Sequence, residues 1–235
     1  MRISWSISCL LSLLLVANCT LPIGNNRVKH APTNISEYTQ RYIESPYRSV
    51  ARIDVADGSG TAFAIGPRTL LTAGHVCESV AFKPTEPMTL TVMLGDGTWM
   101  KSTAKVWATA IYQDHDLCLL RTSRRVLVPL RVASKAPEHG DKVSIYGAPL
   151  GLLGALTEGR VATPILTLEE ADGRRMQYLM LACSSTHGNS GSPVLNARGE
   201  VIGVLVAGFE NYTQLGLAVP LKYIQRFLNE QNVEF

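Results

Sequence analysis

The chain has 235 residues, a net charge of +3 and 17% charged side chains. This length fits one domain or two modest ones, and it is enough to bury a sizeable core. The small net charge and the lack of any lysine or arginine run argue against nucleic acid as a partner. Twelve prolines and nineteen glycines, spread along the chain, suit many short strands joined by turns.

The first nineteen residues differ in kind from the rest. Arg2 precedes an apolar run from Leu10 to Ala17, and a basic start before a short apolar core is typical of a secretory signal peptide. The run is too short for a membrane-spanning helix, and no later segment is a candidate for one. We therefore expect residues 1–19 to be a leader and the protein to be exported, to the periplasm, the cell envelope or the medium.

The end of this leader leaves two outcomes open. Val16-Ala17-Asn18-Cys19 resembles a bacterial lipoprotein cleavage box, although Asn18 stands where glycine or alanine is usual. In the first outcome Cys19 becomes the lipidated first residue, which would be the protein's one link to a membrane. In the second the leader is removed and the chain is released.

Short strands account for most of the remaining chain. Residues 20–49 are polar, and we expect them to form an extended lead-in on the domain surface. From residue 50 onward, apolar segments alternate with turn residues such as Asp57-Gly58-Ser59-Gly60, which is typical of an all-β sandwich or barrel. The expected strands are Val50–Val55, Thr61–Ile65, Thr69–Ala73, Met88–Leu94, Trp99–Ala108, Asp116–Arg121, Asp141–Tyr146, Gly159–Pro164, Gln177–Ala182, Val194–Leu195, Val201–Ala207 and Leu215–Val219.

Only the C-terminal segment has helical periodicity. Its apolar residues fall on one face of a helix that ends near Asn229, and they are Leu221, Ile224, Phe227 and Leu228. Pro220 suits the first turn of this helix, where a missing N–H costs nothing. We find no internal repeat and no second-domain boundary, so residues 50–235 are expected to form one all-β unit with a short C-terminal helix.

Three cysteines lie in the folded part, namely Cys77, Cys118 and Cys183. An odd number excludes complete pairing within one chain. Cys118 lies in an apolar strand and is expected to be a buried thiol, and Cys77 can pair with it only if the fold brings the two together. None of the three has metal-ligand spacing, so we expect no metal and no other cofactor.

Three short motifs stand out against this background. Leu71-Thr72-Ala73-Gly74-His75 delivers a histidine at a strand end, Asp116-Leu117-Cys118-Leu119-Leu120 opens an apolar strand with an acid, and Gly188-Asn189-Ser190-Gly191-Ser192-Pro193 sets a serine between glycines. Each motif alone has an ordinary structural explanation. Together, in the order His, Asp, Ser, they indicate nucleophilic catalysis by an activated serine.

With these motifs the sequence resembles the chymotrypsin-like serine peptidases, from about Val50 to Phe227. It is most similar to the bacterial HtrA-type and glutamyl-endopeptidase-like branches, which also have stretches similar to Gly58–Phe63, Gly147–Gly151 and Gly199–Gly203. The resemblance implies two six-stranded antiparallel β-barrels and hydrolysis of polypeptides through an acyl-enzyme.

The resemblance also implies a role for each residue. Ser190 would be the nucleophile, His75 the general base, and Asp116 the acid that orients the imidazole. The N–H groups of Gly188 and Ser190 would form the oxyanion hole. Asn189 stands where the digestive zymogens carry an aspartate that pairs with a freed N-terminus, so activation by N-terminal cleavage is not expected.

Other residues compete for two of these roles. Asp114 is a rival for Asp116, but Asp116 directly precedes the apolar strand. His115 and His187 are rivals for His75, and we expect His187, three residues before Ser190, to line the substrate cleft instead.

The resemblance further implies an uncharged, fairly open pocket that suits small to medium apolar side chains, with no acidic floor for arginine or lysine. Its expected residues are Ser184, Ser185, Thr186, His187, Val206, Ala207, Gly208 and Gly216. No PDZ-like segment is expected after the peptidase domain.

Two other functions were weighed. The first is a catalytically silent relative that acts as a binding module, against which the intact His75, Asp116, Ser190 and Gly188 argue. The second is an α/β-hydrolase esterase, whose nucleophile elbow needs glycine where this chain has Ser192 and whose triad ends in histidine.

Overall fold

The structure is a computed structural model that describes residues 46–55, 58–81, 87–93, 98–110, 115–170, 173–209 and 212–235. The expected leader (1–19) and most of the expected lead-in (20–49) lie outside these ranges. The last part of the lead-in forms a 3₁₀ turn, η1 (Pro46–Ser49). No helix within the described ranges is long and apolar enough to span a membrane.

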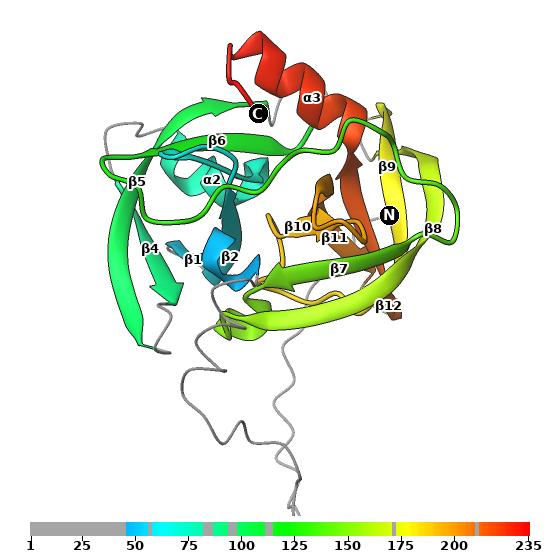
Figure 1. Cartoon of the computed structure of the whole chain (residues 1–235). Coiled ribbons are helices and arrows are strands. Elements are labelled where there is room, and N and C mark those ends of the chain that lie inside the picture. The colour runs from blue at the N-terminus through cyan, green and yellow to red at the C-terminus, as the bar shows by residue number, and fades with distance from the viewer. Residues whose placement is uncertain are drawn as a thin grey trace, which may run out of the picture. The chain divides into compact units, whose positions relative to one another are not determined.

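Two closed six-stranded antiparallel barrels make up the domain, as expected (Figure 1). The first barrel has the strand order β1-β2-β3-β6-β5-β4. Its strands are β1 (Val50–Val55), β2 (Gly58–Ala64), β3 (Thr69–Ala73), β4 (Met88–Met93), β5 (Trp99–Thr109) and β6 (Leu117–Thr122). The second barrel has the order β10-β11-β12-β9-β8-β7. Its strands are β7 (Lys142–Gly147), β8 (Ala155–Glu169), β9 (Arg175–Ala182), β10 (Pro193–Leu195), β11 (Val201–Phe209) and β12 (Tyr212–Pro220).

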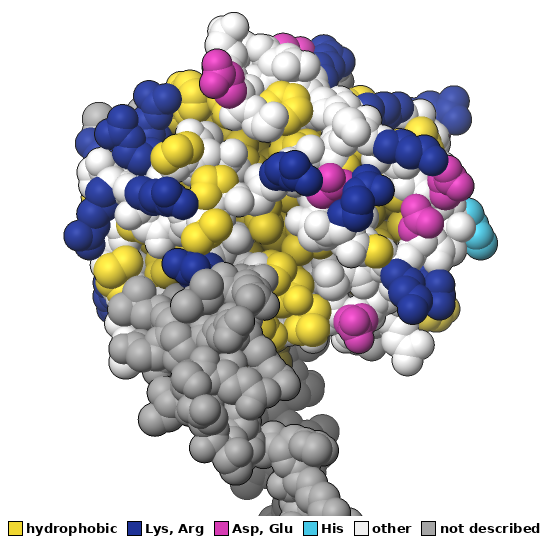
Figure 2. Space-filling model, in the orientation of Figure 1, with side chains coloured by type: hydrophobic (Ala, Val, Ile, Leu, Met, Phe, Trp, Pro, Cys, Tyr) yellow, Lys and Arg dark blue, Asp and Glu magenta, His cyan; other side chains and the backbone are white. Residues whose placement is uncertain are grey.

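The expected C-terminal helix is confirmed as α3 (Leu221–Glu230), and its four apolar residues are buried. Pro220 is the N-cap, in an extended conformation, and does not belong to the first turn. Three of these apolar residues, Ile224, Phe227 and Leu228, belong to the large core cluster, so the helix helps to close the core. On the face shown in Figure 2, charged side chains surround a central group of hydrophobic ones.

Two local predictions are wrong. Gly58-Ser59-Gly60 is not a turn but the start of β2, where Gly58 pairs with Val55 of β1, and Asp57 of the predicted turn lies outside the described residues. A second helix, α2 (Gly74–Ala81), directly follows β3 and contains His75 as its second residue. Its eight residues are too few for hydrophobic periodicity to distinguish a helix from a loop. A further 3₁₀ turn, η2 (Pro149–Gly151), follows β7.

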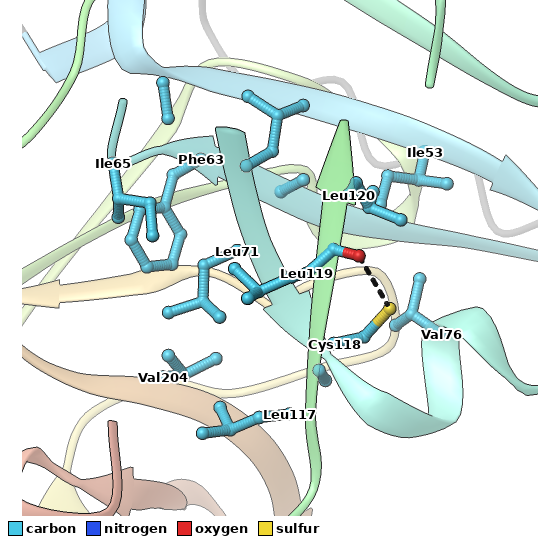
Figure 3. Packing of buried hydrophobic residues seen from close by; sticks show 14 of the residues in the cluster. Ile53, Phe63, Ile65, Leu71, Val76, Leu117, Cys118, Leu119, Leu120 and Val204 are labelled. Atoms are coloured by element: carbon cyan, nitrogen blue, oxygen red, sulfur yellow. Dashed lines mark hydrogen bonds between the residues drawn. The ribbon is translucent and has the colours of Figure 1, made fainter. Parts of the chain in front are cut away.

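The core of the first barrel consists of fully buried aliphatic and aromatic side chains (Figure 3). Phe63 and Leu71 from β2 and β3 pack with Leu119 from β6, and Val204 of β11 belongs to the same cluster. Complete burial of such a side chain stabilises the fold by about 1.5–3 kcal/mol. The core therefore runs across the seam between the barrels and fixes their relative position.

A disulfide joins Cys77 in α2 to Cys118 in β6, with the Cα atoms 6.5 Å apart. The expectation of a free Cys118 thiol is therefore wrong. The 3.7 Å approach of Cys118 Sγ to Leu119 O in Figure 3 is a van der Waals contact, because a disulfide sulfur has no hydrogen to donate. Cys183 is a free buried thiol, and burial raises its pKa to about 11, which keeps it unreactive.

Removing this disulfide is expected to lower the free energy of unfolding by about 2–4 kcal/mol, because the bond closes a long loop in the unfolded chain. The measurement is urea unfolding of the Cys77→Ala/Cys118→Ala double variant, with and without a thiol reductant. The Cys183→Ala variant is the matched control and should keep the reductant sensitivity of the wild type. A wild-type midpoint that reductant does not move would contradict the prediction.

Candidate active site

The three sequence motifs meet at the seam between the barrels. His75 is the second residue of α2, and Asp116 immediately precedes β6, which pairs with β3 in the first barrel. Ser190 lies in the loop that leads into β10 of the second barrel. His75 and Ser190 line the same cavity, so both barrels contribute to one site.

Asp116 holds His75 with both carboxylate oxygens. Its Oδ1 accepts the backbone N–H of His75 at 2.7 Å, and its Oδ2 lies 2.6 Å from the imidazole Nδ1. An ionised carboxylate only accepts hydrogen bonds, so Nδ1 carries the proton and Nε2 of a neutral His75 has a free lone pair. The disulfide sits two residues beyond each partner and ties their two segments together.

The electrostatics of His75 are set mainly by two opposing effects. Burial lowers its pKa, whereas the hydrogen bond and charge of Asp116, with a smaller contribution from Glu78, raise it. The net result is a pKa above 6.5. The imidazole is therefore tuned to accept a proton more readily than a free histidine does.

The loop carrying Ser190 is anchored through its backbone. Thr61 N donates to Ser190 O at 2.8 Å, and Gly191 N donates to Leu205 O at 2.7 Å. Gly191 has φ of +87°, and a side chain there would collide with Thr61 O. The Ser190 hydroxyl lies 3.5 Å from Val206 O, at the outer limit of a hydrogen bond, and does not bond to His75 in this rotamer.

Two backbone N–H groups beside Ser190 are turned away from the loop's internal bonds. His187 O accepts Leu150 N at 2.7 Å, and Asn189 O accepts Ser192 N at 2.9 Å. The C=O and the following N–H of a trans peptide point in opposite directions. The N–H groups of Gly188 and Ser190 therefore point in the direction opposite to the carbonyl groups of His187 and Asn189. Neither N–H group donates a hydrogen bond to another described residue.

The Thr61 hydroxyl is the central contact of this arrangement. It accepts Ala148 N at 3.0 Å and donates to Gly188 O at 2.8 Å, and the whole residue is buried. It therefore links β2 of the first barrel to the nucleophile loop and to the segment after β7. Gly188, with φ of +90°, packs so closely on that segment that a side chain would collide with Ala148 O.

Sequence analysis did not single out Thr61. A threonine in a strand is ordinary, and the one available signal was a polar residue in an otherwise apolar segment, Thr61–Ile65. Its role depends on contacts with residues about 90 and 130 positions later, which no local pattern could reveal.

The cavity beside the site has a volume of about 430 Å³. Most of the expected pocket residues line it, including His187, but Ser184 and Gly216 do not. Gly216 instead lies against Ser185 and Cys183. Leu205 and Phe209 line the cavity and were not predicted. Among the described residues, the lining includes two histidines, His75 and His187, but no carboxylate or lysine.

Of the rival histidines, His187 lines the cavity but His115 lies elsewhere. His115 is buried and its ring lies on Tyr223 of α3, with the ring centroids 4.0 Å apart. Asp114 lies outside the described residues. Among the described residues, no three His, Cys, Asp or Glu side chains converge as metal ligands.

Sequence comparison gives a family and several similar proteins. The family model of the trypsin-like peptidase domain matches residues 60–204. Mitochondrial serine protease HTRA2 of Drosophila willistoni is 31% identical over 191 residues, covering 77% of this chain and 40% of the relative. HTRA2 of Drosophila erecta is also 31% identical, over 77% of this chain and 41% of its own. The chain thus spans about two fifths of the length of these relatives.

Solved structures share the fold. The active form of the Rv3671c protease from M. tuberculosis superimposes with a TM-score of 0.67 at 19% identity, covering 86% of this chain and 88% of that one. Deg5 superimposes with a TM-score of 0.62 at 23% identity, covering 81% and 92%. With the matched domain, the two barrels and the His75–Asp116 pair, the chain belongs to the trypsin-like (chymotrypsin-like) peptidase family.

Proposed function

We propose that the protein is an exported serine endopeptidase that cleaves polypeptides through His75, Asp116 and Ser190. The observation that carries the proposal is the bidentate hold of Asp116 on His75, which faces the same cavity as Ser190. The HtrA-type relatives, named as serine proteases, support the same activity.

In the proposed reaction the Ser190 side chain first rotates from Val206 O toward Nε2 of His75. The imidazole takes the hydroxyl proton as Oγ forms a bond to the scissile carbonyl carbon. Breaking of the C–N bond transfers that proton to the leaving amine and leaves an acyl-enzyme, which water hydrolyses in the same way. Asp116 stabilises the imidazolium without being protonated.

The negative charge of the tetrahedral intermediate would be held by the N–H groups of Gly188 and Ser190. Because both are already oriented by the bonds to His187 O and Asn189 O, little reorganisation is needed when the charge develops. Preorganised donors of this kind are usually the largest electrostatic contribution to such a reaction.

Export is supported by the leader pattern in residues 1–19 and by the Cys77–Cys118 disulfide, because disulfides persist mainly in oxidising compartments. The mass of the mature N-terminus distinguishes a lipid on Cys19 from simple cleavage. The cavity lining, in which Val206, Ala207 and Phe209 lie beside small hydroxyl residues, supports a preference for small to medium apolar side chains before the scissile bond.

The wild-type protein is expected to cleave a peptide library after small or medium apolar residues and to react with a fluorophosphonate probe. Ser190→Ala should lose on the order of a million-fold in turnover and all labelling, because no other group in the cavity replaces the nucleophile. The readouts are mass spectrometry of the cleaved library and in-gel fluorescence.

Two results would contradict this proposal. A folded wild-type protein that neither labels nor cleaves would favour the binding module. Cleavage that follows Arg, Lys or Glu would leave the peptidase intact but reject the uncharged pocket.

Thr61→Val is expected to lower kcat by about a hundredfold, as loss of an oxyanion-hole donor does, while KM changes little. The substitution keeps the shape but leaves Ala148 N–H and Gly188 C=O unpaired. This loosens the Gly188–Asn189 peptide, which adjoins the peptide that carries Gly188 N–H. Thr61→Ser should restore most of kcat, because it returns the hydroxyl. Steady-state kinetics on a peptide from the library measures both constants.

Thr72→Val is the matched control for this prediction. Thr72 Oγ1 donates to Thr61 O at 2.6 Å, so its loss weakens the same buried cluster without touching Gly188. If Thr72→Val and Thr61→Val lower kcat equally, the Thr61 hydroxyl has only a general structural role.

The acidic limb of kcat/KM is expected to have its midpoint above pH 6.5, because the raised pKa of His75 means that the base is lost as pH falls through that value. Glu78→Gln removes one of the contributions that raise the pKa of His75, and should move the midpoint to lower pH with activity retained. The measurement is kcat/KM against pH, with unfolding followed at each pH. A wild-type midpoint below that of a free histidine would contradict the raised pKa of His75.

A further inference from the structure

We propose that the outer face of β5 and β6 is a docking surface for an anionic phospholipid bilayer. The surface, called here the Trp–Lys face, consists of Trp99, Lys101, Lys105 and Trp107 of β5 with Arg121 of β6 and Arg68. It goes beyond the peptidase activity and uses none of the residues of the cavity described above.

The alternation of β5 creates this face. Buried or half-buried residues such as Met100, Ala104 and Val106 point to the core, and the residues between them are exposed. Two of the chain's three tryptophans stand on the exposed side, Trp99 at 55% exposure and Trp107 at 36%. Large indole rings are usually well buried, so two of them on one exposed strand face indicate an interaction surface.

The cations of the face are crowded together. Lys105 and Arg121 are directly opposed cross-strand partners, an arrangement that destabilises a sheet when the charges are alike. Arg68 O accepts the backbone N–H of the residue after Arg121, at 3.0 Å, which brings a third cation alongside. Within the described part of the chain none of the three forms an ion pair. Arg121 instead lies over the Trp107 ring, 4.1 Å from its centroid.

These side chains frame a hollow of about 450 Å³. Arg68, Lys105 and Arg121 line it together with Trp107 and with the hydroxyl residues Thr103 and Ser123. Figure 2 shows Lys and Arg side chains gathered on the side of the molecule where β5 and β6 lie in Figure 1, with no carboxylate among the coloured side chains there. Cations and hydroxyl groups around a hollow suit a phosphate group.

An anionic bilayer can bind both the cations and the tryptophans of the Trp–Lys face, whereas a soluble polyanion can bind only the cations. Trp99 and Trp107 are eight residues apart, which is about 26 Å along an extended strand. Tryptophan prefers the headgroup depth of a membrane, where the ring is in an apolar layer and its N–H is hydrated. The lysines lie between the two rings, at the level where they would meet anionic headgroups.

The test is co-sedimentation of the full chain with vesicles of equimolar phosphatidylglycerol and phosphatidylcholine, compared with vesicles of phosphatidylcholine alone. Binding should be stronger to the anionic vesicles and weaken at high salt. The Lys101→Gln/Lys105→Gln variant should bind about 30-fold more weakly. Trp99→Ala should also bind more weakly at unchanged charge.

Lys135→Gln/Lys142→Gln is the matched control, because it removes the same charge from two exposed lysines in the second half of the chain. Fluorophosphonate labelling of each variant reports that it is folded. If the two double-lysine variants lost vesicle affinity equally, the binding would depend only on the net charge of the protein, and the proposal would be overturned. Equal binding of the wild-type protein to both vesicle types would also overturn it. If Trp99→Ala bound as tightly as the wild type and heparin competed with the vesicles, the face would be assigned to a soluble polyanion, which would overturn the proposal too.

Discussion

The buried hydroxyl of Thr61 joins three segments that would otherwise meet only through side-chain packing. From β2 of the first barrel it bonds across the seam to the backbone of two segments of the second barrel, at Gly188 O in the nucleophile loop and at Ala148 N after β7. The backbone N–H of the same residue bonds to Ser190 O. Because unpaired polar groups in a buried site are costly, all three bonds favour one arrangement of the loop, the one in which Gly188 N–H faces outward.

The catalytic residues come from two different barrels, so hydrogen bonds across the seam are needed to hold them in register. The first barrel holds His75 and Asp116 as a rigid pair, since the Cys77–Cys118 disulfide and two hydrogen bonds connect their segments. The second barrel holds Ser190. Since a displacement of about 1 Å between reacting groups can cost a hundredfold in rate, the bonds across the seam matter as much as the residues that perform the chemistry. The shared core cluster that includes Val204 supports the same alignment.

The elements of the fold that could be predicted from the sequence are those that produce a local pattern of residue types. Short apolar segments between turn residues located the twelve strands, and the spacing of Leu221 to Leu228 located α3, whereas α2 was missed because eight residues show too little periodicity. The candidate site was found from three motifs and a family resemblance. Thr61, the cavity lining by Leu205 and Phe209, and the Cys77–Cys118 pairing could not be found, because each depends on which distant segments meet.

The closed barrel also explains why the exposed side of β5 is informative. The inward residues of a barrel strand are dictated by packing, and a closed barrel leaves no strand edge that charged side chains must protect. Folding therefore places little demand on the outward residues of β5, for which ordinary polar side chains would serve. Two tryptophans and two lysines at those positions, beside Arg121 and away from the cavity, serve neither the core nor the candidate active site. These side chains are therefore explained by a binding partner outside the molecule. A surface with both negative charge and an apolar layer complements their charge and their indole rings.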